Sequence, residues 1–283
     1  MVDVMKSNPR VGAVCGRIHP VGSGFMQWYQ MFEYAVMHWL QKATEHVMGC
    51  VLCSPGCFSL FRGKAILSDN VMRTYTTVAA EPRHFVQYNQ GEDRWLCTLL
   101  LQQGWRVKYS AVSDSYTACP VAFNEFYNQR RRWMPSTIFG TMDLLRDAKN
   151  VVKKNDDISY LYIIYQFFLV VLTLLGPGTI FLGLVGSFSF AFDLNEWTSF
   201  GANALPIVAF TLVCLFGNTE HQLLIAKILS IAYALVMTAV WICKLVHKSD
   251  NSDFSCIFRL TYLHALENFC HLYFVLIQFI LIR

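Results

Sequence analysis

Three side chains near the middle of the chain have the chemistry of a nucleotide-sugar site: Gln129, Arg132 and Trp133. An arginine guanidinium is a planar, permanently charged fork that matches a pyrophosphate, and a glutamine amide both donates and accepts hydrogen bonds. An indole ring offers a flat apolar surface for a sugar ring. Together these residue types suit a pyrophosphate with a saccharide beside it. The alternative is that the triple arginine 130–132 forms a basic solvated stripe or a lipid-binding cluster next to a membrane.

Asp93 is the candidate catalytic residue, because an ionised aspartate can act as a general base toward a sugar hydroxyl. It stands in the segment Gly91-Glu92-Asp93-Arg94-Trp95, just before an apolar run at 96–101. This pattern is typical of the start of a helix, where the helix dipole favours a carboxylate. The alternative is that Glu92 and Asp93 only cap the helix, and capping and catalysis are compatible.

Residues 122–147, which carry Gln129 and Trp133, predict a long helix because apolar residues recur there at helical spacing. The apolar positions are Phe123, Phe126, Tyr127, Met134, Ile138 and Leu145. On such a helix Gln129, Arg132 and Trp133 would point the same way. Helices are also expected near 25–47 and 92–103, and strands at 11–15 and 106–111. Strands that alternate with helices imply an α/β sheet within residues 1–157.

The expected helix at 25–47 is amphipathic. Its broad apolar face carries Phe25, Trp28, Tyr29, Phe32, Val36, Trp39 and Leu40, opposite Gln27, Gln30, Gln41 and Lys42. Such a helix either packs on the sheet or lies in a membrane interface.

The composition indicates a chain of two parts. Of its 283 residues 54% are hydrophobic, and its mean hydropathy is +0.36, whereas soluble domains are about 45–50% apolar. Of the 23 Lys and Arg residues, 18 precede Ile158, which predicts a cytosolic location for residues 1–157 by the positive-inside tendency. The net charge of +4 is too small to indicate a nucleic-acid partner.

The second part, residues 158–283, is expected to be a transmembrane helix region. Its apolar runs lie at 159–187, 203–216, 222–246 and 268–282, and a membrane span needs about 20 apolar residues. The tripeptide Gly176-Pro177-Gly178 predicts a kink in the first run, or a junction between an interfacial piece and a span.

The ten cysteines do not form the framework of a small disulfide-rich domain, and six of them lie in the part expected to be cytosolic. His46, Cys50, Cys53 and Cys57 have a spacing that could hold zinc, but free buried thiols are the favoured interpretation. The isolated histidines His19, His38, His84 and His221 are interpreted as packing or surface residues.

Two of these segments, 91–95 and 129–133, resemble the paired signatures of chitin synthases. A third, Cys53-Ser54-Pro55-Gly56-Cys57-Phe58-Ser59-Leu60-Phe61-Arg62, is similar to the animal type of these enzymes. The likeness covers most of residues 1–180, including the segments 15–20 and 123–128, and it fades beyond about residue 250.

The resemblance implies a processive, inverting glycosyltransferase. It would transfer N-acetylglucosamine from UDP-N-acetylglucosamine to the 4-hydroxyl of a growing β-1,4 chitin chain and export that chain through the membrane. The fold implied is the C-terminal part of a glycosyltransferase A-type catalytic domain, followed by a transmembrane helix cluster. Residues 1–157 would be cytosolic, in a protein of the plasma membrane, and a homo-oligomer is left open.

The resemblance also implies roles for single residues. Asp93 would deprotonate the acceptor hydroxyl, Gln129 and Arg132 would line the pyrophosphate, and Trp133 would stack under the terminal sugar of the acceptor. Arg130 and Arg131 would only add charge.

Substrate contacts are further implied for Glu92, Arg94 and Cys57. The turn at Pro55 and Gly56 would let the backbone approach the sugar, although a plain turn between strands explains it equally well.

The chain departs from the family pattern at the metal site. Mg or Mn is implied by the family, but the Asp-x-Asp motif expected shortly before Val11 is missing, and only Asp3 remains near the start. No metal ligand is therefore assigned, and the chain is interpreted as a portion of a larger enzyme. Three alternatives stay open: a non-catalytic membrane protein of the same ancestry, a related hyaluronan- or cellulose-type synthase, and a transporter.

Overall fold

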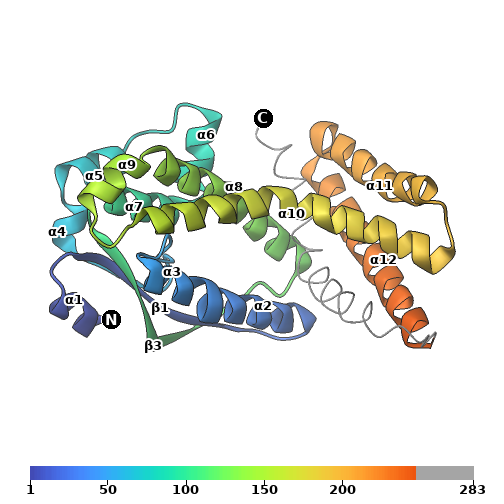
Figure 1. The fold of residues 1–283 in the computed structure, drawn as a ribbon, viewed down its shortest axis with the longest axis horizontal. Helices are drawn as coiled ribbons and strands as arrows, with labels where there is room; N and C mark the ends of the chain where they lie inside the picture. Colours follow the sequence, from blue (N-terminus) through green and yellow to red (C-terminus); the bar gives the residue numbers. More distant parts are fainter. Residues whose placement is uncertain (247–283) are drawn as a thin grey trace. The chain divides into compact units, whose positions relative to one another are not determined.

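The computed structural model describes residues 1–246, except for the side chains at 69, 190–191 and 239–246. The chain forms two compact units, Met1–Val171 and a second that begins at Leu172 (Figure 1). The first unit holds a small sheet with helices, and the described part of the second consists of apolar helices. This arrangement confirms the predicted fold class, an α/β part followed by an all-α part.

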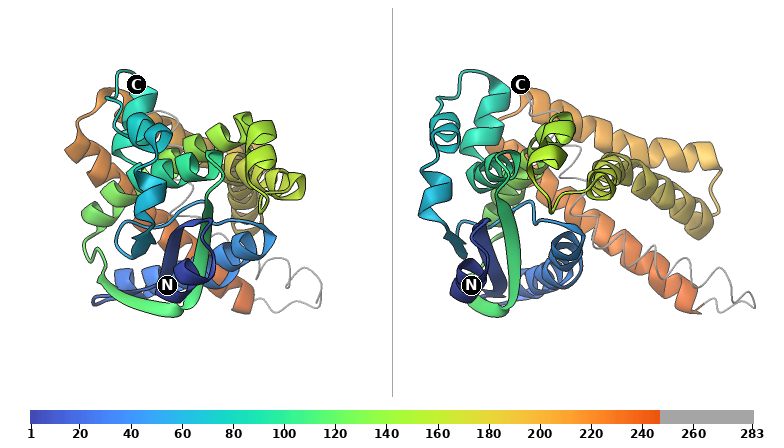
Figure 2. Two further views of the ribbon diagram at one scale, coloured as in Figure 1. Left: turned by 90° about the vertical axis from the view of Figure 1, so that its left-hand side faces the viewer. Right: turned by 60° about the vertical axis from the view of Figure 1, so that its left-hand side comes forward.

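In the part of the chain that the structure describes, the sheet has three strands in the order β2-β1-β3. Strands β1 (Val11–Val21) and β3 (Arg106–Ala118) are parallel, and β2 (Ser59–Phe61) pairs antiparallel with β1. The two long strands lie side by side in both views of Figure 2. Both extend beyond the predicted 11–15 and 106–111, because pairing resumes after an irregularity in which Gly16 faces Ser110 and Arg17 faces Asp114.

Both faces of the sheet are covered by apolar side chains. On one face Ala13 and Cys15 belong to the main core, together with Leu100 of helix α7 (Glu92–Gln102). On the other face Val14 packs in a small cluster with Met5 of helix α1 (Val2–Ser7). Because side chains along a strand point alternately to opposite faces, the run at 11–15 can serve both cores.

The helices predicted near 92–103 and 122–147 are α7 and α8 (Phe123–Arg146). The one predicted near 25–47 is α2 (Phe25–Val36), which continues through a π-helical segment (Met37–Gln41) into α3 (Lys42–Met48). The remaining helical segments of the first unit are α4 (Gly63–Ile66), α5 (Asp69–Tyr75), α6 (Pro82–His84), a π-helical segment (Phe85–Asn89) and α9 (Ala148–Lys154).

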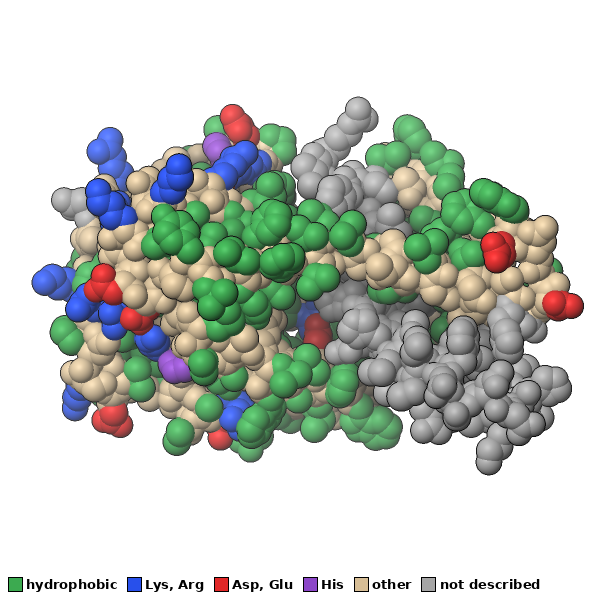
Figure 3. Space-filling view, viewed as in Figure 1, with side chains coloured by type: hydrophobic (Ala, Val, Ile, Leu, Met, Phe, Trp, Pro, Cys, Tyr) green, Lys and Arg blue, Asp and Glu red, His purple; other side chains and the backbone are tan. Residues whose placement is uncertain are grey.

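The segment α2–α3 turns its polar face inward. Gln30, His38, Lys42 and Glu45 are buried, whereas Phe25, Trp28, Phe32, Trp39 and Leu40 are exposed. Hydrophobic side chains accordingly gather over α2 in Figure 3. Helix α2 packs on β1, which agrees with the prediction that it packs on the sheet. Its apolar face is nevertheless left open, which is the arrangement that a membrane-interface helix requires.

Helix α10 (Tyr160–Phe192) begins inside the first unit. Just before it, Asp157 forms ion pairs with Arg106 (2.9 Å) and Lys108 (2.7 Å) of β3. The Tyr162 hydroxyl donates a hydrogen bond to the carbonyl oxygen of Cys50 (2.6 Å). These contacts fix the start of the helix to the sheet and to the loop that precedes β2.

Among the described residues, three helices are long and apolar enough to cross a membrane, with candidate spans Tyr160–Ser189, Glu196–Phe216 and Thr219–Thr238. They lie in α10, α11 (Glu196–Phe216) and α12 (Thr219–Val246). The second span is longer than the predicted run 203–216, because its helix already begins at Glu196. The predicted run 268–282 lies outside the described residues.

The tripeptide 176–178 does not divide α10, which continues as one helix with Pro177 inside it. The helix is thus not interrupted at this point, and the kink and the junction between an interfacial piece and a span both stay predictions.

Candidate functional site

Asp93 lies in the first turn of α7, as predicted. Its Oδ1 accepts a hydrogen bond from the backbone N–H of Arg94 (2.7 Å), and the Cys53 thiol donates to its Oδ2 (3.7 Å). The N-cap residue is Gly91, which has no side chain to make a capping hydrogen bond. The hydrogen bond of Asp93 with the Arg94 N–H satisfies one free N–H group of the first helical turn, so a supporting role for Asp93 at the helix start remains compatible with catalysis.

The start of α7 lies directly against α8. A Cβ placed on Gly91 would be only 2.3 Å from the Cβ of Ser136, so glycine is needed for this approach. The Ser136 hydroxyl in turn donates to the carbonyl oxygen of Trp133 (2.9 Å). Two segments about 40 residues apart in the sequence are thus brought together, with Asp93 two residues from the contact and Trp133 one helical turn from it.

The three residues of the predicted recognition face lie on α8, and their exposure differs. Arg132 is exposed, whereas Gln129 and Trp133 are half-buried. Arg130 is buried, so the triple arginine is not a uniformly solvated stripe. Its guanidinium donates to Oε1 of Gln129 (3.2 Å) and lies 4.2 Å from the centre of the Trp133 ring.

The segment at Pro55, Gly56 and Cys57 is a turn that leads into β2. The Phe58 N–H donates to the carbonyl oxygen of Pro55 (3.2 Å), and Gly56 and Cys57 are exposed. A Cβ on Gly56 would meet nothing within 4 Å. No described part of the protein therefore demands glycine there, and its place in substrate binding stays a prediction.

Two buried charged residues of α3 hold the backbone on which Cys53 stands. The Lys42 ammonium donates to the carbonyl oxygen of Cys53 (3.3 Å), and the Leu52 N–H donates to Oε2 of Glu45 (3.2 Å). Burial raises the pKa of the Cys53 thiol to about 12, so at neutral pH it is protonated and can donate to Asp93. Burial also raises the pKa of Glu45. This support is not predicted above, although Lys42 and Glu45 stand three residues apart, on one helix face.

The zinc alternative is not supported. Among the side chains that the structure describes, no three of His, Cys, Asp or Glu come close enough to hold a metal ion. His46 instead accepts a hydrogen bond from the Tyr109 N–H (3.1 Å), and Cys50, Cys53 and Cys57 are free thiols. For the same reason the described residues do not fit the divalent ion that the family implies, and no step of the chemistry is assigned to it.

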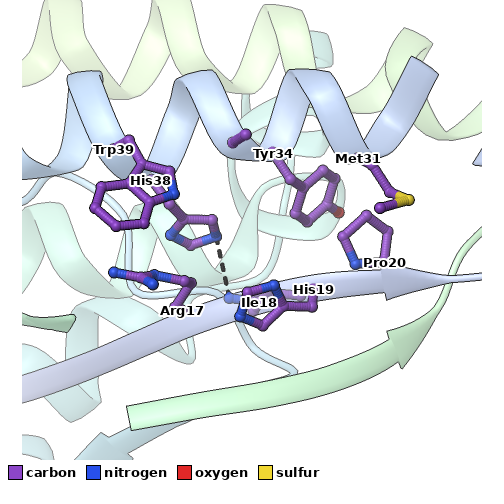
Figure 4. A pocket seen from close by; sticks show the side chains of 9 residues that line it. Arg17, Ile18, His19, Pro20, Met31, Tyr34, His38 and Trp39 are labelled. Atoms are coloured by element: carbon purple, nitrogen blue, oxygen red, sulfur yellow. Dashed lines mark hydrogen bonds between the residues drawn. The ribbon is translucent and has the colours of Figure 1, made fainter. Parts of the chain in front are cut away.

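A small pocket of about 180 Å³ lies between the end of β1 and α2 (Figure 4). It is lined by Arg17, Ile18, His19, Pro20, Met31, Tyr34, Ala35, His38 and Trp39. The Ile18 N–H donates to Nε2 of His38 (3.3 Å), and the Arg17 guanidinium lies 4.2 Å from the centre of the Trp39 ring. None of the predicted site residues lines this pocket. His38 is a packing residue, and His19 pairs with Asp114 at the surface (3.1 Å).

Comparison with known proteins gives a consistent result. A family model described as chitin synthase matches residues 1–247. Chitin synthase chs-2 of Caenorhabditis elegans is 58% identical over 240 residues, which cover 85% of this chain and 14% of that protein. The chitin synthase of Meloidogyne artiellia is 57% identical over 240 residues, with 85% and 13% covered. Chitin synthase V of Metarhizium acridum is 34% identical over 161 residues, with 53% and 9% covered.

The chain thus spans 13–14% of the length of the two relatives at 57–58% identity. The matched region contains the start of α7, the turn before β2 and the segment 129–133 of α8, which are the places where the sequence carries its signatures. On these grounds the chain belongs to the chitin synthase family.

Proposed function

We propose that this chain provides the acceptor side of a chitin-forming glycosyltransferase site. The reaction is the transfer of N-acetylglucosamine from UDP-N-acetylglucosamine to the 4-hydroxyl of a growing β-1,4 chain. The observation that carries the proposal is the contact of Gly91 with Ser136, since it brings the helix start with Asp93 to the helix that bears Trp133.

Asp93 is the general base in this reaction. Its carboxylate accepts the proton of the acceptor 4-hydroxyl while the hydroxyl oxygen forms a bond to C1 of the donor sugar. The bond between C1 and the UDP oxygen breaks, UDP leaves with the electron pair, and attack from the opposite side inverts the configuration at C1. The hydrogen bond from the Arg94 N–H supports this role because it orients the carboxylate. Base catalysis of this kind contributes about 10²–10⁴-fold in rate.

The substrate contacts follow from residue type and exposure. The exposed guanidinium of Arg132 and the amide of Gln129 bind the pyrophosphate, because a planar fork and an amide match its oxygens. The half-buried Trp133 offers a ring face to the terminal sugar of the chain.

The residues next to these elements complete the proposed substrate contacts. Glu92 and Arg94 flank the base, and the turn with Pro55, Gly56 and Cys57 borders the sugar.

The proposed location is the plasma membrane, with residues 1–157 on the cytosolic side and the chitin chain exported between the spans. The three apolar helices support a membrane protein. The open apolar face of α2 supports contact of the first unit with the lipid surface. Assembly into a homo-oligomer stays a prediction.

The test is Asp93→Asn in the native full-length protein, assayed in membranes for incorporation of labelled N-acetylglucosamine into chitinase-sensitive product. The variant should lose about 10²–10⁴-fold in turnover while UDP still binds, because asparagine keeps the shape of the side chain and cannot accept the proton. Asp3→Asn is the matched control, since Asp3 is an exposed carboxylate in the first turn of α1.

Turnover of Asp93→Asn near that of Asp3→Asn would refute the assignment of the base. If the product resisted chitinase but were digested by hyaluronidase or cellulase, the polymer made would be the related one and not chitin.

A further inference from the structure

Arg130 is the buried member of the triple arginine. Its side chain is 7% exposed, and it forms an ion pair with Glu33 of α2, whose side chain is 22% exposed. It also donates to Oε1 of Gln129, and its guanidinium lies 4.2 Å from the centre of the Trp133 ring and 4.8 Å from that of Phe126. One side chain therefore contacts both half-buried residues of the proposed recognition face.

The planar shape of the Arg130 guanidinium explains how one side chain can contact Gln129, Trp133 and Glu33 together. A planar group uses its edge for hydrogen bonds and its face for stacking on an aromatic ring, which a lysine ammonium cannot do. The N–H groups at the edge point to Glu33 and Gln129, and the positive charge stacks on the indole. Because Oε1 of Gln129 is engaged, its NH₂ group is the part of the amide left to donate to a ligand.

Glu33 holds the guanidinium in this position. A buried charge requires a partner, and removal of one member of such a pair leaves the other uncompensated. Since Glu33 lies on α2 and Arg130 on α8, the ion pair also fixes α2 against the helix that bears Trp133.

We propose that Arg130, held by Glu33, is a positioning residue that sets the orientation of Trp133 and of the Gln129 amide for the acceptor sugar and the pyrophosphate. The inference rests on the proposed function, because it assigns how two residues of that site are held.

The experiment is a double-mutant cycle on the native full-length protein in membranes, with kcat/KM for UDP-N-acetylglucosamine as the readout. Arg130→Lys keeps the charge and loses the fork, so it should lower kcat/KM by up to about 10²-fold, the loss that a misplacement of about 1 Å can cause. Glu33→Gln should give a similar loss, and Glu33→Asp a smaller one. Arg146→Lys is the matched control, since Arg146 is an exposed arginine on the same helix.

The cycle separates positioning from a general effect on folding. In a Trp133→Ala background the loss caused by Arg130→Lys should shrink severalfold, because the ring that it orients is gone. The inference would be overturned if Arg130→Lys caused the same fold-loss in kcat/KM with Trp133 and with Trp133→Ala. It would also be overturned if Arg130→Lys were as active as Arg146→Lys. If Arg130→Lys does not accumulate in membranes, Glu33→Gln enters the same cycle with the same two outcomes.

The proposed function can fail separately. Full turnover of Asp93→Asn would refute the base whatever Arg130 does. A dead Asp93→Asn together with independent effects of Arg130 and Trp133 would refute only the positioning role.

Discussion

Gly91→Ala should be damaging although it adds one methyl group. At this residue φ is −134° and ψ is 41°, so the backbone has no positive φ to strain an alanine. The cost comes from contact, because the new Cβ would lie 2.3 Å from the Cβ and 2.7 Å from the Oγ of Ser136. Ordinary contact begins at 3.4 Å. Helices α7 and α8 must therefore separate by about 1 Å at this point.

Two magnitudes follow from this separation. Overpacking of a close contact costs about 1–3 kcal/mol in the free energy of unfolding. For a unit of about 150–250 residues each kcal/mol lowers the melting temperature by about 2–4 °C, so the expected loss is about 2–12 °C. Because Asp93 moves with α7 and Trp133 with α8, the same 1 Å should reduce chitin synthesis by about 10²-fold.

The assay measures both quantities on one preparation, as thermal unfolding in detergent and as incorporation of labelled N-acetylglucosamine in membranes. Gly63→Ala is the control for stability, because a Cβ at that helical position meets nothing within 4 Å. Ser136→Gly should rescue Gly91→Ala, apart from about 1 kcal/mol for glycine inside a helix. Ser136→Ala should not, because it keeps the clashing Cβ. Equal rescue by both, or a Gly91→Ala variant as stable and active as the wild type, would refute the close contact.

Two further outcomes follow from single side chains. Arg132→Lys should raise KM for UDP-N-acetylglucosamine, because lysine lacks the bidentate fork, whereas Trp133→Ala should impair chain elongation. The same modest loss in both, with unchanged donor affinity, would favour a lipid-facing basic stripe. Burial, aided by the charges of Lys42 and Arg17, lowers the pKa of His38 to about 3 from 6.5. Because the unfolded state then binds the proton more readily, stability should fall as the pH drops from about 6.5 to 3, by at most about 1.4 kcal/mol per pH unit for this group. The measurement is the free energy of unfolding of the wild type and of His38→Gln at several pH values in this range. If the free energy of the variant fell as steeply with decreasing pH as that of the wild type, His38 would not be the cause.

The spacing of apolar residues predicted the helices and strands whose apolar side chains are buried in the protein core. The strands β1 and β3 and the helices α7 and α8 were found where the sequence indicated, because their buried side chains recur with the period of their own backbone. The pattern could not give the full strand lengths, since pairing beyond Gly16 depends on an irregularity in the partner strand.

The inward polar face of α2–α3 could not be predicted from the same pattern. An amphipathic helix looks alike in sequence whether its apolar face meets a sheet or a lipid surface. Here the buried side of the segment carries Gln30 and Lys42, which donate to the carbonyl oxygens of Pro120 and Cys53, 90 and 11 residues further along the chain. Only the tertiary structure identifies those partners.

The burial of Arg130 did leave a signal in the sequence. The apolar stripe of α8 runs through Phe126, Tyr127 and Met134, and position 130 fills the gap between them at helical spacing. Arg132 is two residues further, about 200° around the helix, and therefore points elsewhere. An arginine inside an apolar stripe predicts a buried charge with a partner. The partner itself, Glu33, is about a hundred residues away and could not be identified from spacing.

The contacts of α8 show why its central residues suit a recognition role. Trp133 stands midway between two contacts on the same helix, Arg130 one turn before it and Ser136 one turn after it. Arg130 joins the helix to α2 through Glu33, and Ser136 joins it to the start of α7 through Gly91. Trp133 is thus held from both sides along the helix, by one contact to α2 and by one to the start of α7. In the proposed site the base and the sugar-stacking ring come from different elements and need a fixed separation, because the ring would hold the sugar whose hydroxyl the base deprotonates.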